Sequence, residues 1–121
     1  MTDKPVILAV DSNRANLELL SHEVSREGYT TVSAASLEEL DQAIRENESL
    51  ALSLIDLSGF DERIWERCEE LRKAKIPFIV ISPQRSPTIQ RDSLKYGASG
   101  LLLKPLAIQE LLEHIRTMIG D

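Results

Sequence analysis

The sequence predicts an α/β fold in which one parallel sheet of five strands carries helices on both faces. Three observations predict it. Five short segments with the character of strands alternate with segments of helical periodicity, most of the strand segments are unbroken apolar runs, and no repeat or linker interrupts the alternation. Such alternation favours parallel strands joined by right-handed crossovers. At 121 residues the chain has the length of one compact domain, so we expect residues 1–121 to form a single unit.

The strands are predicted from short runs rich in apolar or β-branched residues. Four runs are apolar throughout or nearly so, as expected of strands covered on both faces. They are Val6–Val10, Leu50–Ile55, Phe78–Ile81 and Leu101–Leu103. The fifth, Thr30–Ala34, is more polar and β-branched, which is typical of a half-exposed edge strand.

The helices are predicted from apolar stripes that recur at helical spacing, so that each segment can bury one face. The stripes are Leu17, Leu20 and Val24; Leu37, Leu40 and Ile44; Ile64, Cys68 and Leu71; and Ile108, Leu111, Leu112, Ile115, Met118 and Ile119. Gly120 is a stop signal for the last helix. Two N-termini carry cap signals, a capping box at Ser36 and Glu39 and an N-cap at Ser86 followed by Pro87. We expect the helix after Pro87 to be short and weakly anchored.

Composition and charge narrow the function classes. A net charge of −6 disfavours direct binding to nucleic acid or to an anionic membrane, because both need a basic face. No stretch approaches the roughly 18 apolar residues of a membrane span, and the N-terminus lacks the features of a signal peptide. Cys68 is the single cysteine, so no internal disulfide can form. We therefore expect a cytoplasmic protein.

Polar residues follow four of the predicted strands at their carboxyl ends. Asp11 and Ser12 follow the first strand, Asp56 the third, Ser82 the fourth and Lys104 the fifth. Ligands of open α/β sheets bind beyond this edge, so we expect these side chains to converge. A carboxylate can attack phosphorus, acidic oxygens can hold a divalent cation, and a lysine with a hydroxyl can hold the transferred oxygens. The set indicates phosphoryl transfer.

Simpler interpretations exist for each residue taken alone. Asp11 could accept hydrogen bonds at the start of the first helix, and Ser12 or Asn13 could be the N-cap of that helix. Asp56 could be a loop acid and Lys104 a surface lysine. Asp56 follows a wholly apolar strand and is matched by Lys104 at another strand end, and this convergence favours the functional interpretation.

Four segments carry a family resemblance that spans nearly the whole chain: VILAVDSNRANLELL, SLIDLSGFD, FIVIS and GASGLLLKPL. In this order and spacing they resemble the signature segments of response-regulator receiver domains. The resemblance implies a flavodoxin-like (βα)5 three-layer sandwich with strand order 2-1-3-4-5. It also implies that Asp56 is the phosphoacceptor, and that Mg²⁺ is bound by Asp11, Asp56 and the backbone carbonyl of Ser58.

The resemblance further implies that the Ser82 hydroxyl and the Lys104 ammonium bind the phosphoryl group, and that the Lys104–Pro105 bond is cis. Two positions depart from the family pattern. Ser12 stands where a second acid is usual, so Mg²⁺ binding is expected to be weaker, and Leu101 stands where the switch aromatic is usual.

Arg14 is a second basic residue that we consider for the site, as a hypothesis. Arg14 lies just beyond the loop that holds Asp11 and Ser12, and it could supply positive charge to the phosphoryl site.

These residues predict a phosphoacceptor of a two-component phosphorelay, and not an enzyme. A sensor histidine kinase or phosphotransfer protein would phosphorylate Asp56, and an unidentified output partner would respond. The alternative is a pseudo-receiver that works as a phosphorylation-independent interaction module, which the changes at Ser12 and Leu101 favour. A flavin carrier is disfavoured by the loop after the first strand, and a dehalogenase-type phosphatase by Ser58, where that class needs an acid.

Overall fold

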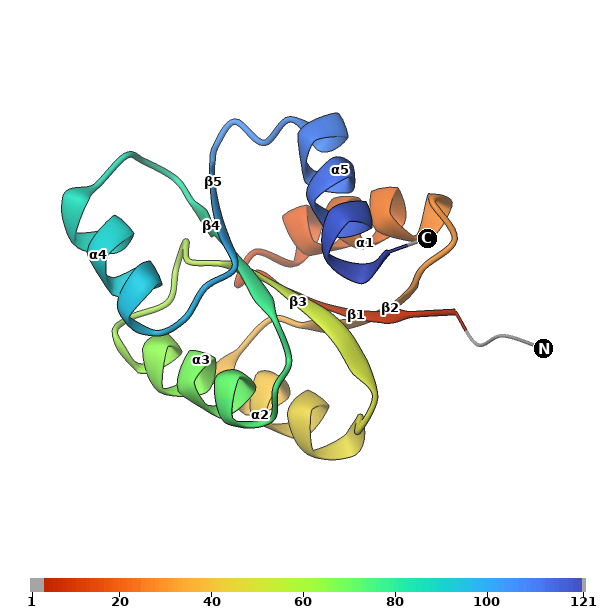
Figure 1. Ribbon diagram of the computed structural model, residues 1–121, viewed down its shortest axis with the longest axis horizontal. Coiled ribbons are helices and arrows are strands. Elements are labelled where there is room, and N and C mark those ends of the chain that lie inside the picture. The colour runs from red at the N-terminus through yellow and green to blue at the C-terminus, as the bar shows by residue number, and fades with distance from the viewer. Residues whose placement is uncertain (1–3, 121) are drawn as a thin grey trace.

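The computed structural model describes residues 4–120, and these form one five-stranded parallel sheet between two layers of helices (Figure 1). All neighbouring strands are parallel and their order is β2-β1-β3-β4-β5. The strands are β1 (Val6–Val10), β2 (Thr30–Ala34), β3 (Leu50–Asp56), β4 (Phe78–Ser82) and β5 (Gly100–Leu103). The predicted fold class and strand order are therefore confirmed.

Five helices cover the sheet, and each follows one strand. They are α1 (Arg14–Arg26), α2 (Leu37–Glu46), α3 (Arg63–Lys73), α4 (Pro87–Lys95) and α5 (Ile108–Ile119). The apolar stripes of α1 and α5 pack in one core cluster and those of α2 and α3 in the other, so the helices lie on opposite faces of the sheet. Within residues 4–120, no helix has the length and apolar character needed to cross a membrane.

The helix N-termini show how the sequence sets the start of each element. Asn13 caps α1, with its Oδ1 accepting from the N–H of Asn16 at 3.0 Å. Ser36 caps α2 in the same way through the N–H of Glu39, but the Glu39 carboxylate accepts from the N–H of Ala35, one residue earlier than a standard capping box requires. Ser86 caps α4 as predicted.

The second edge strand is less buried than its composition predicts. β5 was expected to be covered on both faces, yet only Leu102 of this strand is buried. The reason is that β5 pairs with β4 alone, and α4 covers it poorly. Leu94 of α4 is 73% exposed, and this helix is held by buried Ser93 and by Tyr96, which packs on the α2/α3 core.

Candidate functional site

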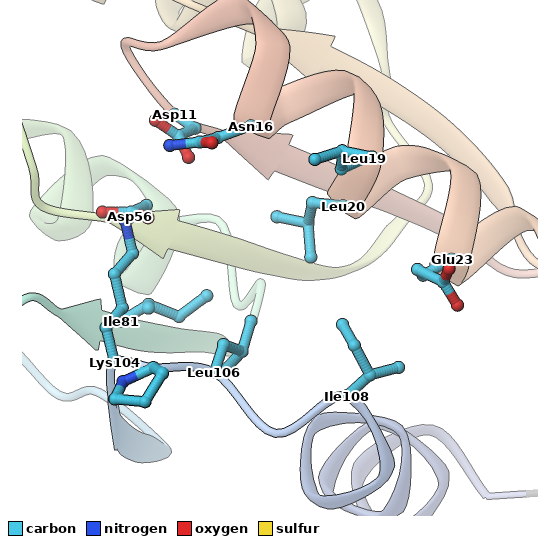
Figure 2. A pocket seen from close by; sticks show the side chains of 11 residues that line it. Asp11, Asn16, Leu19, Leu20, Glu23, Asp56, Ile81, Lys104, Leu106 and Ile108 are labelled. Atoms are coloured by element: carbon cyan, nitrogen blue, oxygen red, sulfur yellow. Dashed lines mark ion pairs between the residues drawn. The ribbon is translucent and has the colours of Figure 1, made fainter.

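The candidate site lies where the carboxyl ends of β1, β3 and β5 meet (Figure 2). The Nζ of Lys104 is 2.6 Å from Oδ2 of Asp56, and the Asp56 side chain is only 4% exposed. Residues that are 48 positions apart in the sequence, 56 and 104, thus form a largely buried ion pair because parallel strands end at one edge of the sheet. The Lys104–Pro105 bond that follows is cis, as the resemblance implied.

Both carboxylate oxygens of Asp56 have a partner. Oδ1 accepts a hydrogen bond from the backbone N–H of Ser58 at 2.9 Å, while Oδ2 faces Lys104. The Nζ of Lys104 also lies 3.4 Å from the Ser58 hydroxyl. The orientation of the Asp56 carboxylate is therefore fixed by a loop amide on one side and an ammonium on the other.

Asp11 is the second buried carboxylate of the site. Its Oδ1 accepts from the N–H of Asn13 at 2.9 Å, so it does stabilise the start of α1 as the simpler interpretation held. Burial raises the pKa of Asp11 above its ordinary value; the Asn13 hydrogen bond opposes this, and the nearby negative charge of Asp56 adds to it. Two carboxylates thus share one buried corner, and Lys104 contributes positive charge there.

Ser12 does not point away from the site. Its Oγ donates a hydrogen bond to the backbone carbonyl of Ser58 at 2.8 Å. Gly59 lies against it with φ +81°, and a Cβ at Gly59 would come within 2.0 Å of the Ser12 Oγ. The loop after β1 is therefore tied to the loop after β3, a contact that residue spacing gave no means of finding.

Ser82 is fully buried at the end of β4, beside the site in the sheet. The backbone N–H of Lys104 donates to the Ser82 carbonyl at 2.9 Å. The Ser82 hydroxyl, however, donates to the carbonyl of Gln84 in its own loop at 2.7 Å. The structure therefore places Ser82 next to Lys104 but turns its hydroxyl to the β4–α4 loop.

The hypothesis that Arg14 serves the site is wrong for this structure. Its Nη2 is 2.6 Å from Oε2 of Glu39, at the start of α2, and its side chain is 70% exposed. The Ala35 N–H, together with Arg14, lowers the pKa of the Glu39 carboxyl. The opposite charge on α2 has drawn Arg14 toward that helix, so it links α1 to α2 instead.

The position of the usual switch aromatic is filled by Leu101, which is half-buried on β5. An aromatic pair lies elsewhere on the same side of the sheet: Trp65 of α3 stacks on Tyr96 at the end of α4, with ring centroids 5.4 Å apart and planes within 13°. Trp65 is therefore a packing residue between helices.

A groove of about 430 Å³ opens from the site and runs between α1 and the start of α5 (Figure 2). Asp11, Asp56 and Lys104 lie at one end of it. The aliphatic side chains of Leu19, Leu20, Leu106 and Ile108 line much of the rest, together with the polar Asn16 and Glu23. Sequence reasoning missed this groove, although Leu19, which is 67% exposed, stands off the buried stripe of α1 and was a signal that could have been used.

The donor set of the site fits a hard divalent cation. Asp11, Asp56 and the Ser58 carbonyl offer oxygen atoms, which Mg²⁺ prefers. Among residues 4–120, however, no three His, Cys, Asp or Glu side chains form a group that could hold a metal ion. Two carboxylates would therefore need the carbonyl and water to complete an octahedral shell.

Comparison with known proteins identifies the family. Residues 7–116 match the model of the response regulator receiver domain, so the chain belongs to this family. It is 31% identical over 116 residues to response regulator MprA of Mycobacterium leprae, covering 93% of this chain and 50% of that protein. It is 28% identical over 120 residues to the polar-differentiation response regulator DivK of Brucella ovis, covering 95% of this chain and 96% of that protein. The chain thus spans half the length of one relative and nearly all of another.

Solved structures agree with this assignment. A CheY-like receiver domain protein from Methanospirillum hungatei superimposes with a TM-score of 0.86 at 29% identity, covering 97% of this chain and 94% of that one. A response regulator receiver protein from Pseudomonas putida gives 0.86 at 26% identity, covering 97% and 99%. The protein is therefore a receiver domain of two-component signalling, a class of signalling module.

Proposed function

We propose that the chain is a phosphoacceptor whose Asp56 receives a phosphoryl group and thereby switches protein–protein interactions. The observation that carries the proposal is the buried pair of Asp56 and Lys104, 2.6 Å apart, at the end of an open groove. A buried carboxylate paired with a single lysine, and reachable from solvent, is a nucleophile held in place with positive charge beside it.

The chemistry follows from these atoms. A carboxylate oxygen of Asp56 forms a bond to phosphorus while the bond from phosphorus to the leaving group breaks, and the leaving group keeps that electron pair. Lys104 offsets the charge on the phosphoryl oxygens, and the Ser82 hydroxyl turns from the Gln84 carbonyl toward one of them. A Mg²⁺ ion held by Asp11, Asp56 and the Ser58 carbonyl would supply further charge compensation.

The groove supports a protein as phosphoryl donor, namely a sensor histidine kinase or a phosphotransfer protein. Its aliphatic side chains, including the exposed Leu19, offer contact surface in the same groove as Asp56. The net charge of −6 argues against nucleic acid as a direct partner. The output partner then binds a surface whose shape depends on the state of Asp56.

The test is incubation with Mg²⁺ and acetyl phosphate, followed by intact-mass spectrometry. We expect a mass gain of one phosphoryl group that is lost in Asp56→Asn. Asp61→Asn is the matched control, because Asp61 is an exposed acid of the following loop that pairs with Arg63. Phosphorylation of Asp56→Asn to the wild-type level would exclude Asp56 as the acceptor.

A second candidate function is the pseudo-receiver, and the Ser12–Ser58 hydrogen bond favours it. In that case the two loops are held together by the protein's own hydroxyl and carbonyl, without metal or phosphate. The two candidates separate in beryllofluoride, a phosphoryl mimic: changes in backbone amide NMR shifts around Asp56 support the phosphoacceptor. Unchanged spectra at millimolar Mg²⁺ support the pseudo-receiver.

A further inference from the structure

Ser12 stands where a second metal-binding acid is usual, and its side chain makes a contact of its own in the site. Its hydroxyl donates to the Ser58 carbonyl across 46 residues of sequence, at 2.8 Å. This carbonyl is the oxygen that the proposed Mg²⁺ site needs in addition to its two carboxylates. Ser12, at the position of the second acid, is therefore hydrogen-bonded to an oxygen that the proposed Mg²⁺ ion would use.

Replacing the usual acid at position 12 with serine changes how this side chain acts on the Ser58 carbonyl. An ionised carboxylate only accepts hydrogen bonds, so at position 12 it would leave the Ser58 carbonyl free and add an oxygen for the cation. The serine hydroxyl instead donates a hydrogen bond to the carbonyl oxygen. The hydroxyl engages one of the two lone pairs of the carbonyl oxygen and draws electron density from it, so a cation at the same oxygen is bound less tightly.

The surroundings keep the hydroxyl in place. Gly59 follows the bonded carbonyl at φ +81°, and any Cβ there would overlap the Ser12 Oγ at 2.0 Å. Ser58 is itself fixed from the other side, because its N–H donates to Asp56 and its hydroxyl lies 3.4 Å from Lys104. Both backbone polar groups of Ser58, its N–H and its C=O, are thus hydrogen-bonded.

We propose that Ser12 is a positioning residue that competes with the divalent cation for the Ser58 carbonyl and so sets the metal affinity of the site. The inference rests on the proposed function in placing the cation between Asp11, Asp56 and Ser58. It separates two causes of weak binding: a ligand oxygen that is missing, and a ligand oxygen that is engaged. Only the second cause makes removal of the Ser12 hydroxyl improve binding.

The experiment is a titration with MgCl₂, without any phosphoryl donor, read from the backbone amide NMR shifts of Ser58 and Gly59. Ser12→Ala frees the carbonyl and adds no ligand, so we expect it to bind Mg²⁺ about two- to fivefold more tightly than wild type. Ser12→Asp frees the carbonyl and adds an oxygen, so it should bind more tightly still. Ser21→Ala is the control, because it removes a hydroxyl that bonds to Ser33 instead.

Equal Mg²⁺ affinity in wild type and Ser12→Ala, with a gain in Ser12→Asp alone, would overturn the proposal and leave the missing ligand as the whole cause. Weaker binding in Ser12→Ala, or no binding in any variant, would overturn it as well. Failure of the phosphoacceptor function is distinguishable, since it appears as absent labelling of Asp56 by acetyl phosphate whatever the metal affinities. Thermal melts of each variant confirm that the compared proteins are folded.

Discussion

The ammonium of Lys104 lies 2.6 Å from Oδ2 of Asp56, and this ion pair is the centre of the site's electrostatics. Asp11, also buried, adds a second carboxylate to the same corner. A lone buried charge is costly, whereas a paired one can be held with little net loss. Lys104 therefore has a structural task in the resting protein as well as its proposed task toward the phosphoryl group.

This double task predicts the effect of Lys104→Met. The substitution leaves Asp56 buried without its cation, so we expect the free energy of unfolding at neutral pH to fall by about 2 to 3 kcal/mol. Phosphorylation of Asp56 by acetyl phosphate should also slow. Urea unfolding followed by Trp65 fluorescence measures the first effect, and intact-mass kinetics the second.

The matched control is the same substitution in Asp56→Asn. With the Asp56 carboxylate already removed, Lys104→Met should cost less than about 1 kcal/mol, because the charge that pairs with Lys104 at 2.6 Å is gone and only the weaker influence of Lys104 on Asp11 is lost. Strictly additive losses in the double variant would show that the two side chains are not energetically coupled and would contradict the prediction.

Ser82 supplies a second prediction, because its hydroxyl is bonded to the Gln84 carbonyl at 2.7 Å. Ser82→Ala should lower the free energy of unfolding by about 1 kcal/mol through the lost buried hydrogen bond. Asp56 should still be labelled by acetyl phosphate, but beryllofluoride should no longer shift the amides of the β4–α4 loop. A loop response that is unchanged in Ser82→Ala would contradict the proposed turn of this hydroxyl.

The pairing of Arg14 with Glu39 predicts that Arg14→Ala leaves the beryllofluoride response unchanged, since the Arg14 side chain pairs with Glu39 and not with Asp56.

Glu39 should instead affect how the free energy of unfolding depends on pH. Because the Glu39 pKa is lowered on folding, Glu39 stabilises the protein above its ordinary pKa of 4.5, and this is lost as pH falls through the lowered value.

Glu39→Gln should therefore lower the unfolding free energy at pH 7 by at most about 1 kcal/mol, as befits an exposed pair. The difference from wild type should vanish at acidic pH. A constant difference across the whole range, measured by urea unfolding, would mean that the carboxylate charge is not what stabilises this corner.

The fold could be predicted because its signals are local and repeated. A short, β-branched apolar run such as Val6–Val10 is typical of a strand buried on both faces, and a stripe such as Leu17, Leu20 and Val24 buries one face of a helix. The exposure of β5 was missed because it depends on which strands become edges. The strand order itself came from family resemblance, and not from periodicity.

The site was predictable to the level of which strand ends meet. Asp56 ends β3 and Lys104 directly follows β5, so the backbone brings both residues to the same edge of the sheet, within reach of each other's side chains. The Ser12 and Arg14 contacts depend on where each side chain turns at the start of α1, and that depends on partners from other segments, Ser58 and Glu39. No spacing rule contains that information.

Cys68 gives a prediction that reports on the core. Its thiol is fully buried on α3, and burial raises its pKa to about 12. Since the thiolate is the reactive form, we expect Cys68 to resist a thiol-specific disulfide reagent at pH 8 in the folded protein and to react at once in denaturant. Fast labelling without denaturant would show that α3 opens locally.

Gly59 gives the last prediction, through its contact with Ser12. Gly59→Ala places a side chain at φ +81° and drives its Cβ into the Ser12 Oγ, so we expect a loss of about 2 kcal/mol or more in unfolding free energy. Part of this cost is the backbone conformation and part is the collision. In Ser12→Ala the nearest remaining contact is the Cβ, at 3.0 Å, so Gly59→Ala should cost measurably less there. Gly28→Ala, at φ +97° with open space around it, isolates the backbone contribution. If Gly59→Ala costs no more than Gly28→Ala and is unaffected by Ser12→Ala, then the Ser12 hydroxyl is not packed against this loop in solution.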